Sequence, residues 1–279
     1  MTYRELLSNC ADVPDNERLL MGIMNWSLGE FLRYAEDESD PKTVGRFQEG
    51  IGRLRAHEPL QYILGEAPFY GRMFRVDRRV LIPRFDTEIL VSAALRKLDE
   101  RNADGAERPR VLDLCTGSGC IALTLLLEHP DISMTASDLS ADALDLAKEN
   151  ARRLSGSEET VRWIQSDLFD ELDGVYDLIV TNPPYIKNAD IETLDPEVRD
   201  HEPHTALAGG DDGLQIIRRI AKDAKAYLFP QGQILMEIGD EEGEDVLRLF
   251  KEEGYEEPMI LKDLAGRDRV LTARRGRNG

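Results

Sequence analysis

The 279-residue sequence contains no apolar run close to the roughly 20 residues that a membrane-spanning helix needs. Its first residues also lack the apolar core of a signal peptide and the basic face of a transit peptide, because charged residues such as Arg4, Glu5 and Asp12 interrupt them. These absences predict a cytoplasmic protein that does not associate with a membrane.

Cysteine is scarce, with Cys10, Cys115 and Cys120 as the only three. They form neither a CxxC pair nor another ligand spacing, so a disulfide framework and a structural zinc site are not expected. The two histidines of HEPH (201–204) are spaced for a helical metal site, but the proline between them breaks helix geometry. We therefore expect no metal.

Positive charge is also in short supply, since 35 Lys and Arg residues face 54 Asp and Glu residues, for a formal net charge of -19. Binding along a nucleic-acid backbone depends on a positive surface that neutralises phosphates. The charge balance therefore argues against a direct nucleic-acid partner. Hydrophobic residues make up 41% of the chain, which is enough for a substantial core.

The pattern of apolar residues divides the chain into three parts. In residues 1–66, apolar positions recur at spacings of three and four, and Pro41 opens a second such stretch, which predicts a small helical bundle domain. Residues 67–80 alternate around Gly71, which predicts a β-hairpin within a linker over 67–84. Residues 85–279 form the third part.

Short apolar segments alternate with amphipathic ones after Arg110. This order predicts a Rossmann-like α/β domain with a mostly parallel sheet. The C-terminal segment 258–274 instead predicts two strands joined by a tight turn at Gly266, and thus an antiparallel hairpin at the sheet edge. The expected strands are 110–115, 133–138, 161–167, 175–182 and 232–239, and the expected helices are 120–129, 140–154, 211–228 and 241–254.

A glycine loop follows the first of these strands in the segment DLCTGSGCIA (113–122). Gly117, Gly119 and Ala122 satisfy the G-x-G-x-x-G/A pattern, in which the backbone turns tightly from strand to helix beside a ligand. Asp138 ends the next strand about twenty residues later, where a carboxylate can accept hydrogen bonds from both ribose hydroxyls. Together they indicate an adenosine-containing ligand, either a dinucleotide or S-adenosylmethionine.

Neighbouring acidic residues favour S-adenosylmethionine. Asp113 precedes the glycines, where a carboxylate can hold a methionine ammonium group directly or through water, whereas a pyrophosphate gains nothing from an anion. Asp167 is placed to reach the adenine amino group, with Leu168 packing on the ring. The predicted cofactor site consists of Asp113, Cys115, Thr116, Gly117, Ser118, Gly119, Asp138, Leu139, Asp167, Leu168 and Asn182.

The segment Asn182-Pro183-Pro184-Tyr185 ends a predicted strand abruptly, because its prolines remove two backbone donors. A planar NH2 group is a poor nucleophile, since its lone pair is delocalised. The Asn182 side-chain carbonyl and the Pro183 main-chain carbonyl can each accept one N–H and turn the lone pair out of the plane. Tyr185 can stack on the planar group. We predict a methyl transfer in which Asn182, Pro183 and Tyr185 are catalytic, and in which all four residues bind the substrate.

The combination of DLCTGSG, Asp138, SDLF (166–169) and IVTNPPYI (179–186) resembles class I amino-methyltransferases. EPLQYILG (58–65), FRVDRRVLIPRFDTEIL (74–90), HEPHTALAGGDDGL (201–214), EIG (237–239) and DLAGRDRV (263–270) are similar to the HemK/PrmC family, the release factor glutamine methyltransferases. Cys115 and Leu168 depart from the commoner glycine and tryptophan of that family, and Phe85 and Asp86 from its proline and glutamate.

This resemblance implies that the substrate is the glutamine of a Gly-Gly-Gln loop on a class I peptide chain release factor, methylated on its side-chain amide nitrogen. It also implies that the helical N-terminal domain contacts the release factor, and that S-adenosylhomocysteine is the product. Three alternatives remain. One is a catalytically silent adaptor that binds release factor through its helices, which the intact site disfavours. A nucleic-acid adenine or cytosine methyltransferase would stack an extruded base on Tyr185. A nicotinamide-dependent oxidoreductase fits the glycine loop but leaves residues 182–185 unexplained.

Overall fold

The structure is a computed structural model that describes residues 1–103 and 108–277. It divides into two compact units, one of Met1–Glu66 with Asp195–His201 and one of Ala67–Leu194 with Glu202–Gly279. No helix in the described ranges has the length and apolar content that crossing a bilayer requires.

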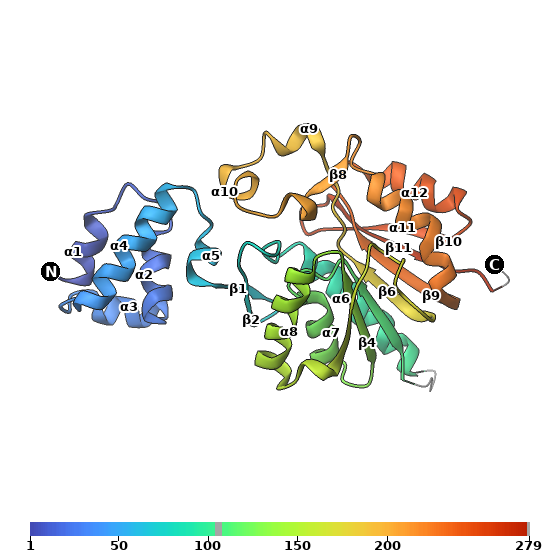
Figure 1. The fold of residues 1–279 in the computed structure, drawn as a ribbon, viewed down its shortest axis with the longest axis horizontal. Helices are drawn as coiled ribbons and strands as arrows, with labels where there is room; N and C mark the ends of the chain where they lie inside the picture. The colour runs from blue at the N-terminus through green and yellow to red at the C-terminus, as the bar shows by residue number, and fades with distance from the viewer. Residues whose placement is uncertain (104–107, 278–279) are drawn as a thin grey trace. The chain divides into compact units, whose positions relative to one another are not determined.

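The first unit is mainly a bundle of short helices around a core that includes Leu19, Leu20 and Phe47 (Figure 1). Local capping explains where several of them begin. Ser27 forms a capping box, and Asp40 caps a helix whose first residue is Pro41. The predicted helical bundle is confirmed. Its helices are α1 (Tyr3–Ser8), α2 (Asn16–Met24), α3 (Leu28–Tyr34), α4 (Pro41–Arg55) and α5 (Leu60–Leu64), and α10 (Pro196–Arg199) also belongs to this unit.

The expected hairpin is present as β1 (Glu66–Phe69) and β2 (Arg72–Arg75). Tyr70 and Gly71 form its two-residue turn with φ values of 48° and 73°, as a turn that matches the twist of the strands requires. Phe69 and Phe74 are buried and meet edge to face at a centroid distance of 6.0 Å. They belong to the core of the second unit.

The second unit is built on a seven-stranded sheet of order β10-β11-β9-β6-β3-β4-β5. The strands from β9 to β5 are mutually parallel, and β11 and β10 continue the sheet antiparallel. The predicted parallel sheet with an antiparallel edge hairpin is therefore confirmed. The strands are β3 (Arg110–Leu114), β4 (Ser133–Asp138), β5 (Val161–Gln165), β6 (Tyr176–Thr181), β9 (Leu228–Glu237), β10 (Glu256–Lys262) and β11 (Asp268–Arg274).

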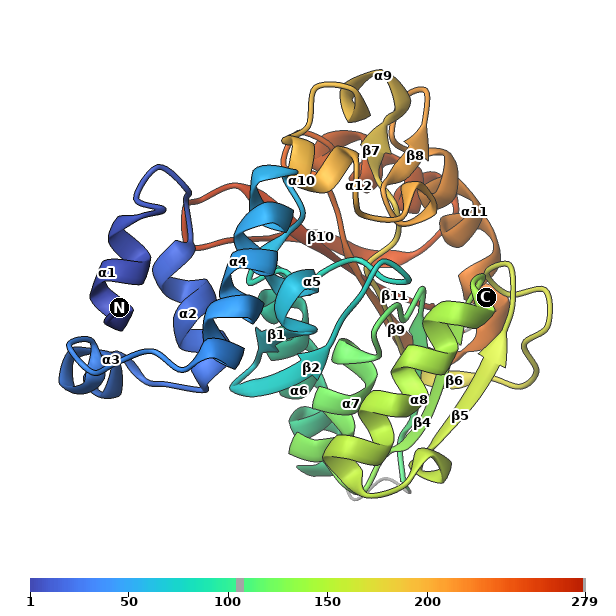
Figure 2. The same ribbon diagram turned by 60° about the vertical axis from the view of Figure 1, so that its left-hand side comes forward.

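Alternating strand residues supply two separate cores. Val111 faces a core with α6 (Thr87–Ala103), α7 (Cys120–Glu128) and α8 (Ala141–Ser155), whereas Leu112 faces a core with α11 (Gln215–Asp223) and α12 (Gly243–Glu252). Both views show α7 and α8 side by side near β4 (Figure 2). The unit therefore has three layers, with the sheet between two layers of helices.

One expected helix is shorter than its pattern suggested. We expected a helix over 211–228, but α11 begins at Gln215, because Gly213 has a φ of 81° and Asp212 accepts a hydrogen bond from the Leu214 backbone. Its last turn is the 3-10 helix η3 (Ala224–Tyr227), after which β9 begins at Leu228, four residues earlier than expected. The remaining short elements are η1 (Glu158–Thr160), β7 (Ile186–Lys187), α9 (Asn188–Ile191), η2 (His204–Ala206) and β8 (Ala208–Gly210).

Candidate functional site

A cavity of about 580 Å³ lies at the carboxyl ends of β3, β4 and β6, within the second unit. Ligands of open parallel sheets bind at this edge, and the volume is typical of a small-molecule site. Among the predicted site residues, those that line it are Cys115, Thr116, Gly117, Ser118, Asp138, Leu139, Asp167, Leu168, Asn182 and Pro184. Asp113, Gly119, Pro183 and Tyr185 do not line it.

The glycine loop leaves room for a ligand on one side and packs tightly on the other. Gly117 has a φ of 55°, and a Cβ atom there would have no neighbour within 4 Å. Gly119 has a φ of 78°, and a Cβ atom there would lie 3.2 Å from the Ala147 side chain of α8. Gly117 therefore permits the approach of a ligand, and Gly119 permits the close contact of loop and helix.

Asp138 is held in place by backbone donors. Its Oδ2 accepts from the Gly117 N–H and its Oδ1 from the Ser140 N–H, each at 2.9 Å. Burial raises the pKa of its carboxyl, and these N–H donors oppose the rise. The carboxylate thus reaches the cavity next to the open face of Gly117. This arrangement fits the adenosine part of S-adenosylmethionine, because a fixed acceptor meets the ribose edge where the backbone leaves space.

Asp113 lies beneath the loop instead of in the cavity. It is fully buried, and its Oδ2 accepts from Thr116 Oγ1 at 2.6 Å and from the Ala122 N–H at 3.0 Å. Burial raises the pKa of Asp113 to about 7. Direct contact with a methionine ammonium group is not available in this position. The carboxyl instead ties the glycine loop to the start of α7.

The other side of the predicted cofactor site contains two strained backbone positions. Cys115 and Leu168 have φ values of 62° and 52°, in the left-handed region that glycine adopts most easily. This explains why a glycine suits position 115, where the HemK/PrmC pattern commonly has one. Beside Leu168, Asp167 forms an ion pair with Arg219 at 3.0 Å.

Asn182 follows the last residue of β6 and is oriented by one hydrogen bond. Its Nδ2 donates to Thr87 Oγ1 at 3.2 Å. The Oδ1 atom, and the main-chain carbonyl of buried Pro183, accept no hydrogen bond from the described part of the chain. Because Asn182 lines the cavity, its Oδ1 is available there to accept an N–H from a substrate.

Tyr185 points its hydroxyl away from solvent, into a buried polar group of residues. The hydroxyl donates to Glu237 Oε1 at 3.2 Å, and burial raises the pKa of the tyrosine. Glu237 ends β9, and Thr87 begins α6. The sequence patterns assigned no role to Thr87 or Glu237 beyond the family segments that contain them. Spacing could not reveal them, because 95 and 52 residues separate them from Asn182 and Tyr185.

Arg269 joins the same buried group. Its guanidinium lies 3.3 Å from an Asp86 carboxylate oxygen and 3.5 Å from one of Asp263. The first contact connects β11 to the residue before Thr87. Arg269 therefore balances some of the negative charge that is buried around Tyr185 and Glu237.

A glycine-rich segment supports Tyr185 from behind. Strand β7 pairs in parallel with β8, and a Cβ atom on Gly209 would lie 2.7 Å from Tyr185 Cα and 2.4 Å from the Gly213 carbonyl oxygen. Gly209 thus permits an approach that a larger residue would block.

Glu202 accepts a hydrogen bond from Arg84 at 2.5 Å and one from the Ile82 N–H at 3.3 Å. These bonds connect the segment before α6 to the segment that precedes β8, and both segments contribute residues to the cavity.

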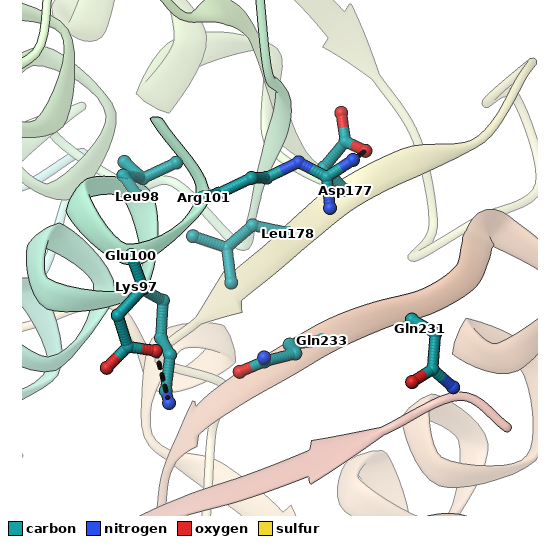
Figure 3. A pocket seen from close by; sticks show the side chains of 8 residues that line it. All are labelled: Lys97, Leu98, Glu100, Arg101, Asp177, Leu178, Gln231 and Gln233. Carbon is teal, nitrogen blue, oxygen red and sulfur yellow. Dashed lines mark hydrogen bonds and ion pairs between the residues drawn. The ribbon is translucent and has the colours of Figure 1, made fainter. Parts of the chain in front are cut away.

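A second cavity, of about 180 Å³, lies near the amino end of β6 (Figure 3). Its charged residues pair with one another: Arg101 with Asp177, and Lys97 with Glu100 at 2.9 Å. This second cavity lies at the amino end of β6, whereas Asn182 follows its carboxyl end. The larger cavity is therefore the candidate site.

Comparison with known proteins gives concordant results. The family model "PrmC N-terminal domain" matches residues 8–65, and "Methyltransferase small domain" matches residues 87–195. The chain is 42% identical to a release factor glutamine methyltransferase of Streptococcus pneumoniae, over 98% of this chain and 96% of the relative. It is 40% identical to one of Agrobacterium fabrum, over 94% and 90%. A crystal structure of a methyltransferase from Pyrococcus furiosus shares the fold, with 15% identity, a TM-score of 0.55, and coverage of 85% of this chain and all of that one.

Proposed function

The chain belongs to the release factor glutamine methyltransferase family, and we propose that it methylates the side-chain amide nitrogen of the glutamine in the Gly-Gly-Gln loop of class I peptide chain release factors. The family membership makes it an S-adenosylmethionine-dependent protein-glutamine methyltransferase. The observation that carries the substrate proposal is the unused Asn182 Oδ1 at the cavity, since Nδ2 is already committed to Thr87.

Catalysis rests on how the protein holds the amide. Bound S-adenosylmethionine supplies an electrophilic methyl group. Asn182 Oδ1 and the Pro183 carbonyl oxygen each accept one N–H of the glutamine, which turns the nitrogen lone pair out of the amide plane. Tyr185 limits the angle of the glutamine, because Glu237 and Gly209 fix the position of its ring. No strong base is needed before attack, and the proton leaves afterwards to solvent.

The cofactor is proposed to lie along the other side of the cavity. Asp138 binds the ribose and residues 115–118 surround the methionine part, while Gly119 permits the close packing of the loop on α8. Leu139 and Leu168 pack on the adenine ring. Asp167 accepts a hydrogen bond from the adenine amino group. The geometry supports these roles through the open face of Gly117 and the fixed carboxylate of Asp138. We propose that the reaction uses no metal, because each role above is filled by a side chain or backbone group.

The partner is a protein. The helical first unit would bind the body of the release factor, as the match of residues 8–65 to the PrmC N-terminal domain suggests. The net charge of -19 disfavours direct binding of nucleic acid. A translation factor as substrate would place the reaction in the cytoplasm.

The decisive experiment incubates the purified protein with S-adenosylmethionine and a purified class I release factor, followed by mass spectrometry of the digested factor. We expect the mass of one added methyl group on the Gly-Gly-Gln peptide. A release factor with this glutamine replaced by alanine is the matched control, and it should gain nothing. Label that enters DNA, RNA or another residue, with an unmodified Gly-Gly-Gln peptide, would contradict the proposal.

A further inference from the structure

Behind Asn182 lies a group of buried polar residues, of which Thr87 also lines the cavity and Glu237 does not. Thr87 and Glu237 are only 2% and 1% exposed, and they come from the start of α6 and the end of β9. Burying a polar group costs free energy unless it is hydrogen-bonded. A carboxylate at this depth therefore requires a compensating arrangement of donors.

The side-chain amide of Asn182 has two ends of nearly equal size and opposite hydrogen-bonding character. Sterics alone cannot decide which end faces the cavity. If the amide turned over, its NH2 group would meet the N–H donors of the substrate, and neither would find an acceptor. The orientation in the structure depends on Thr87 Oγ1 acting as the acceptor for Nδ2.

Glu237 can decide which way the Thr87 hydroxyl donates. An ionised carboxylate accepts hydrogen bonds and donates none. Burial raises the pKa of Glu237, and the Thr87 hydroxyl, the charge of Arg269 and the Tyr185 hydroxyl, which donates to Oε1 at 3.2 Å, oppose that rise and favour the carboxylate. With the single Thr87 proton directed to Glu237, only the oxygen lone pairs of Thr87 remain for Asn182.

We propose that Thr87 and Glu237 are positioning residues that fix the Asn182 amide with Oδ1 toward the substrate. In this arrangement Thr87 Oγ1 accepts from Asn182 Nδ2 at 3.2 Å, and the Thr87 proton is directed to Glu237 Oε2, a buried oxygen that has no other hydrogen-bond partner among the described residues. Asn182 Oδ1 then accepts from the substrate. Tyr185 donates to the same carboxylate, so Glu237 positions both side chains that are proposed to contact the glutamine. The inference rests on the proposed function, because it requires a substrate that presents N–H donors.

The test compares turnover, cofactor affinity and thermal stability in four variants. Thr87→Val removes the acceptor at nearly constant volume, and Thr87→Ser keeps it. Glu237→Gln provides a donor to Thr87, which frees the Thr87 proton for Asn182 Oδ1 and favours the overturned amide. Thr124→Val is the matched control, because Thr124 is equally buried in α7 and its hydroxyl has no partner among the described residues.

We expect kcat for release-factor methylation to fall on the order of 10- to 100-fold in Thr87→Val and Glu237→Gln. The Kd for S-adenosylmethionine, measured by calorimetry, should stay within about threefold of wild type, because the cofactor contacts are unchanged. Thr87→Ser should restore most of the turnover, and Thr124→Val should match wild type.

Wild-type kcat in Thr87→Val would overturn the inference. A Thr87→Ser variant as slow as Thr87→Val would also overturn it, because packing of the threonine methyl group would then be the cause. If Glu237→Gln fails to fold, the two Thr87 variants still decide the question. A wild-type protein that does not methylate the release factor would overturn the proposed function and this inference with it. An active wild-type protein with an equally active Thr87→Val variant would overturn this inference alone, so the two failures are distinguishable.

Discussion

The two sides of the cavity are built in different ways. On the side proposed for the cofactor, Gly117, Asp138 and Leu168 come from one continuous stretch of the chain, and backbone N–H groups hold the Asp138 carboxylate. On the substrate side, Asn182 and Tyr185 are held by Thr87 and Glu237, which lie far away in the sequence. The proposed cofactor site is thus local in the sequence, whereas the proposed substrate site depends on long-range contacts.

The sharpest separation of the two sides should come from Asn182→Ala. The variant loses the proposed amide acceptor, so we expect turnover to fall on the order of 10²- to 10³-fold, as when one hydrogen-bonding group is removed from a preorganised site. Calorimetry should show little change in cofactor affinity. Asn188→Ala, which removes an exposed asparagine that bonds Asp211, is the control. Equal losses of turnover and affinity would show that Asn182 serves the cofactor or the fold.

Asp138→Ala should give the opposite result. The variant loses a carboxylate that accepts from the Gly117 N–H and is proposed to bind the ribose, so cofactor binding should weaken about 10- to 100-fold, as expected for hydrogen bonds to a charged group. At saturating S-adenosylmethionine, kcat should recover to within a few-fold of wild type. The exposed acid Asp142, in the first turn of α8, provides the control variant Asp142→Ala. A kcat that stays low at saturation would mean that Asp138 also positions the substrate side.

Gly209→Ala tests whether long-range support is specific to the substrate side. The added Cβ atom would collide with the backbone of Tyr185 and Gly213, so we expect a loss of about 2 kcal/mol in unfolding free energy and about tenfold in turnover. Urea denaturation and the methylation assay measure these effects. Gly45→Ala in α4 is the control, because nothing lies within 4 Å of its Cβ position, and it should be neutral or stabilising. A fully active Gly209→Ala variant would show that the close contact of Gly209 with Tyr185 is not needed for catalysis.

The smallest effect concerns pH. Burial raises the pKa of Glu242 to about 7. The negative charges of Asp212 and Asp240 add to this rise, and the positive charge of Lys187 opposes it. Between about pH 4.5 and 7 the unfolded chain releases this proton while the folded protein keeps it, so its contribution to stability is complete at the acidic end and lost by about pH 7. Partial solvent access reduces the loss to about 1 to 2 kcal/mol. Urea denaturation at several pH values in this range should show that the unfolding free energy declines less with pH in Glu242→Gln than in wild type. Equal declines in the two proteins would contradict the raised pKa of Glu242.

The sequence by itself determined the elements that depend on neighbouring residues. The glycine loop, Asp138, the parallel strands and the C-terminal hairpin follow from local turns and from apolar periods of two or three to four residues. The end of β6 before Asn182 follows likewise from two prolines, which cannot donate to a sheet. The predicted substrate came from the resemblance of several segments to one family, because the pattern of apolar residues carries no information about a substrate.

Only the tertiary structure decided what surrounds Asn182 and Tyr185. Thr87 begins an ordinary amphipathic helix and Glu237 ends an apolar strand, so neither has a local signal of function. They meet the site because β6 and β9 are neighbours in the sheet and α6 packs against both. The same folding buried Asp113, which the sequence had placed in the cavity, beneath the glycine loop. Burial and hydrogen-bond direction arise from the packing of distant segments, and these two properties set which atoms remain free for the substrate.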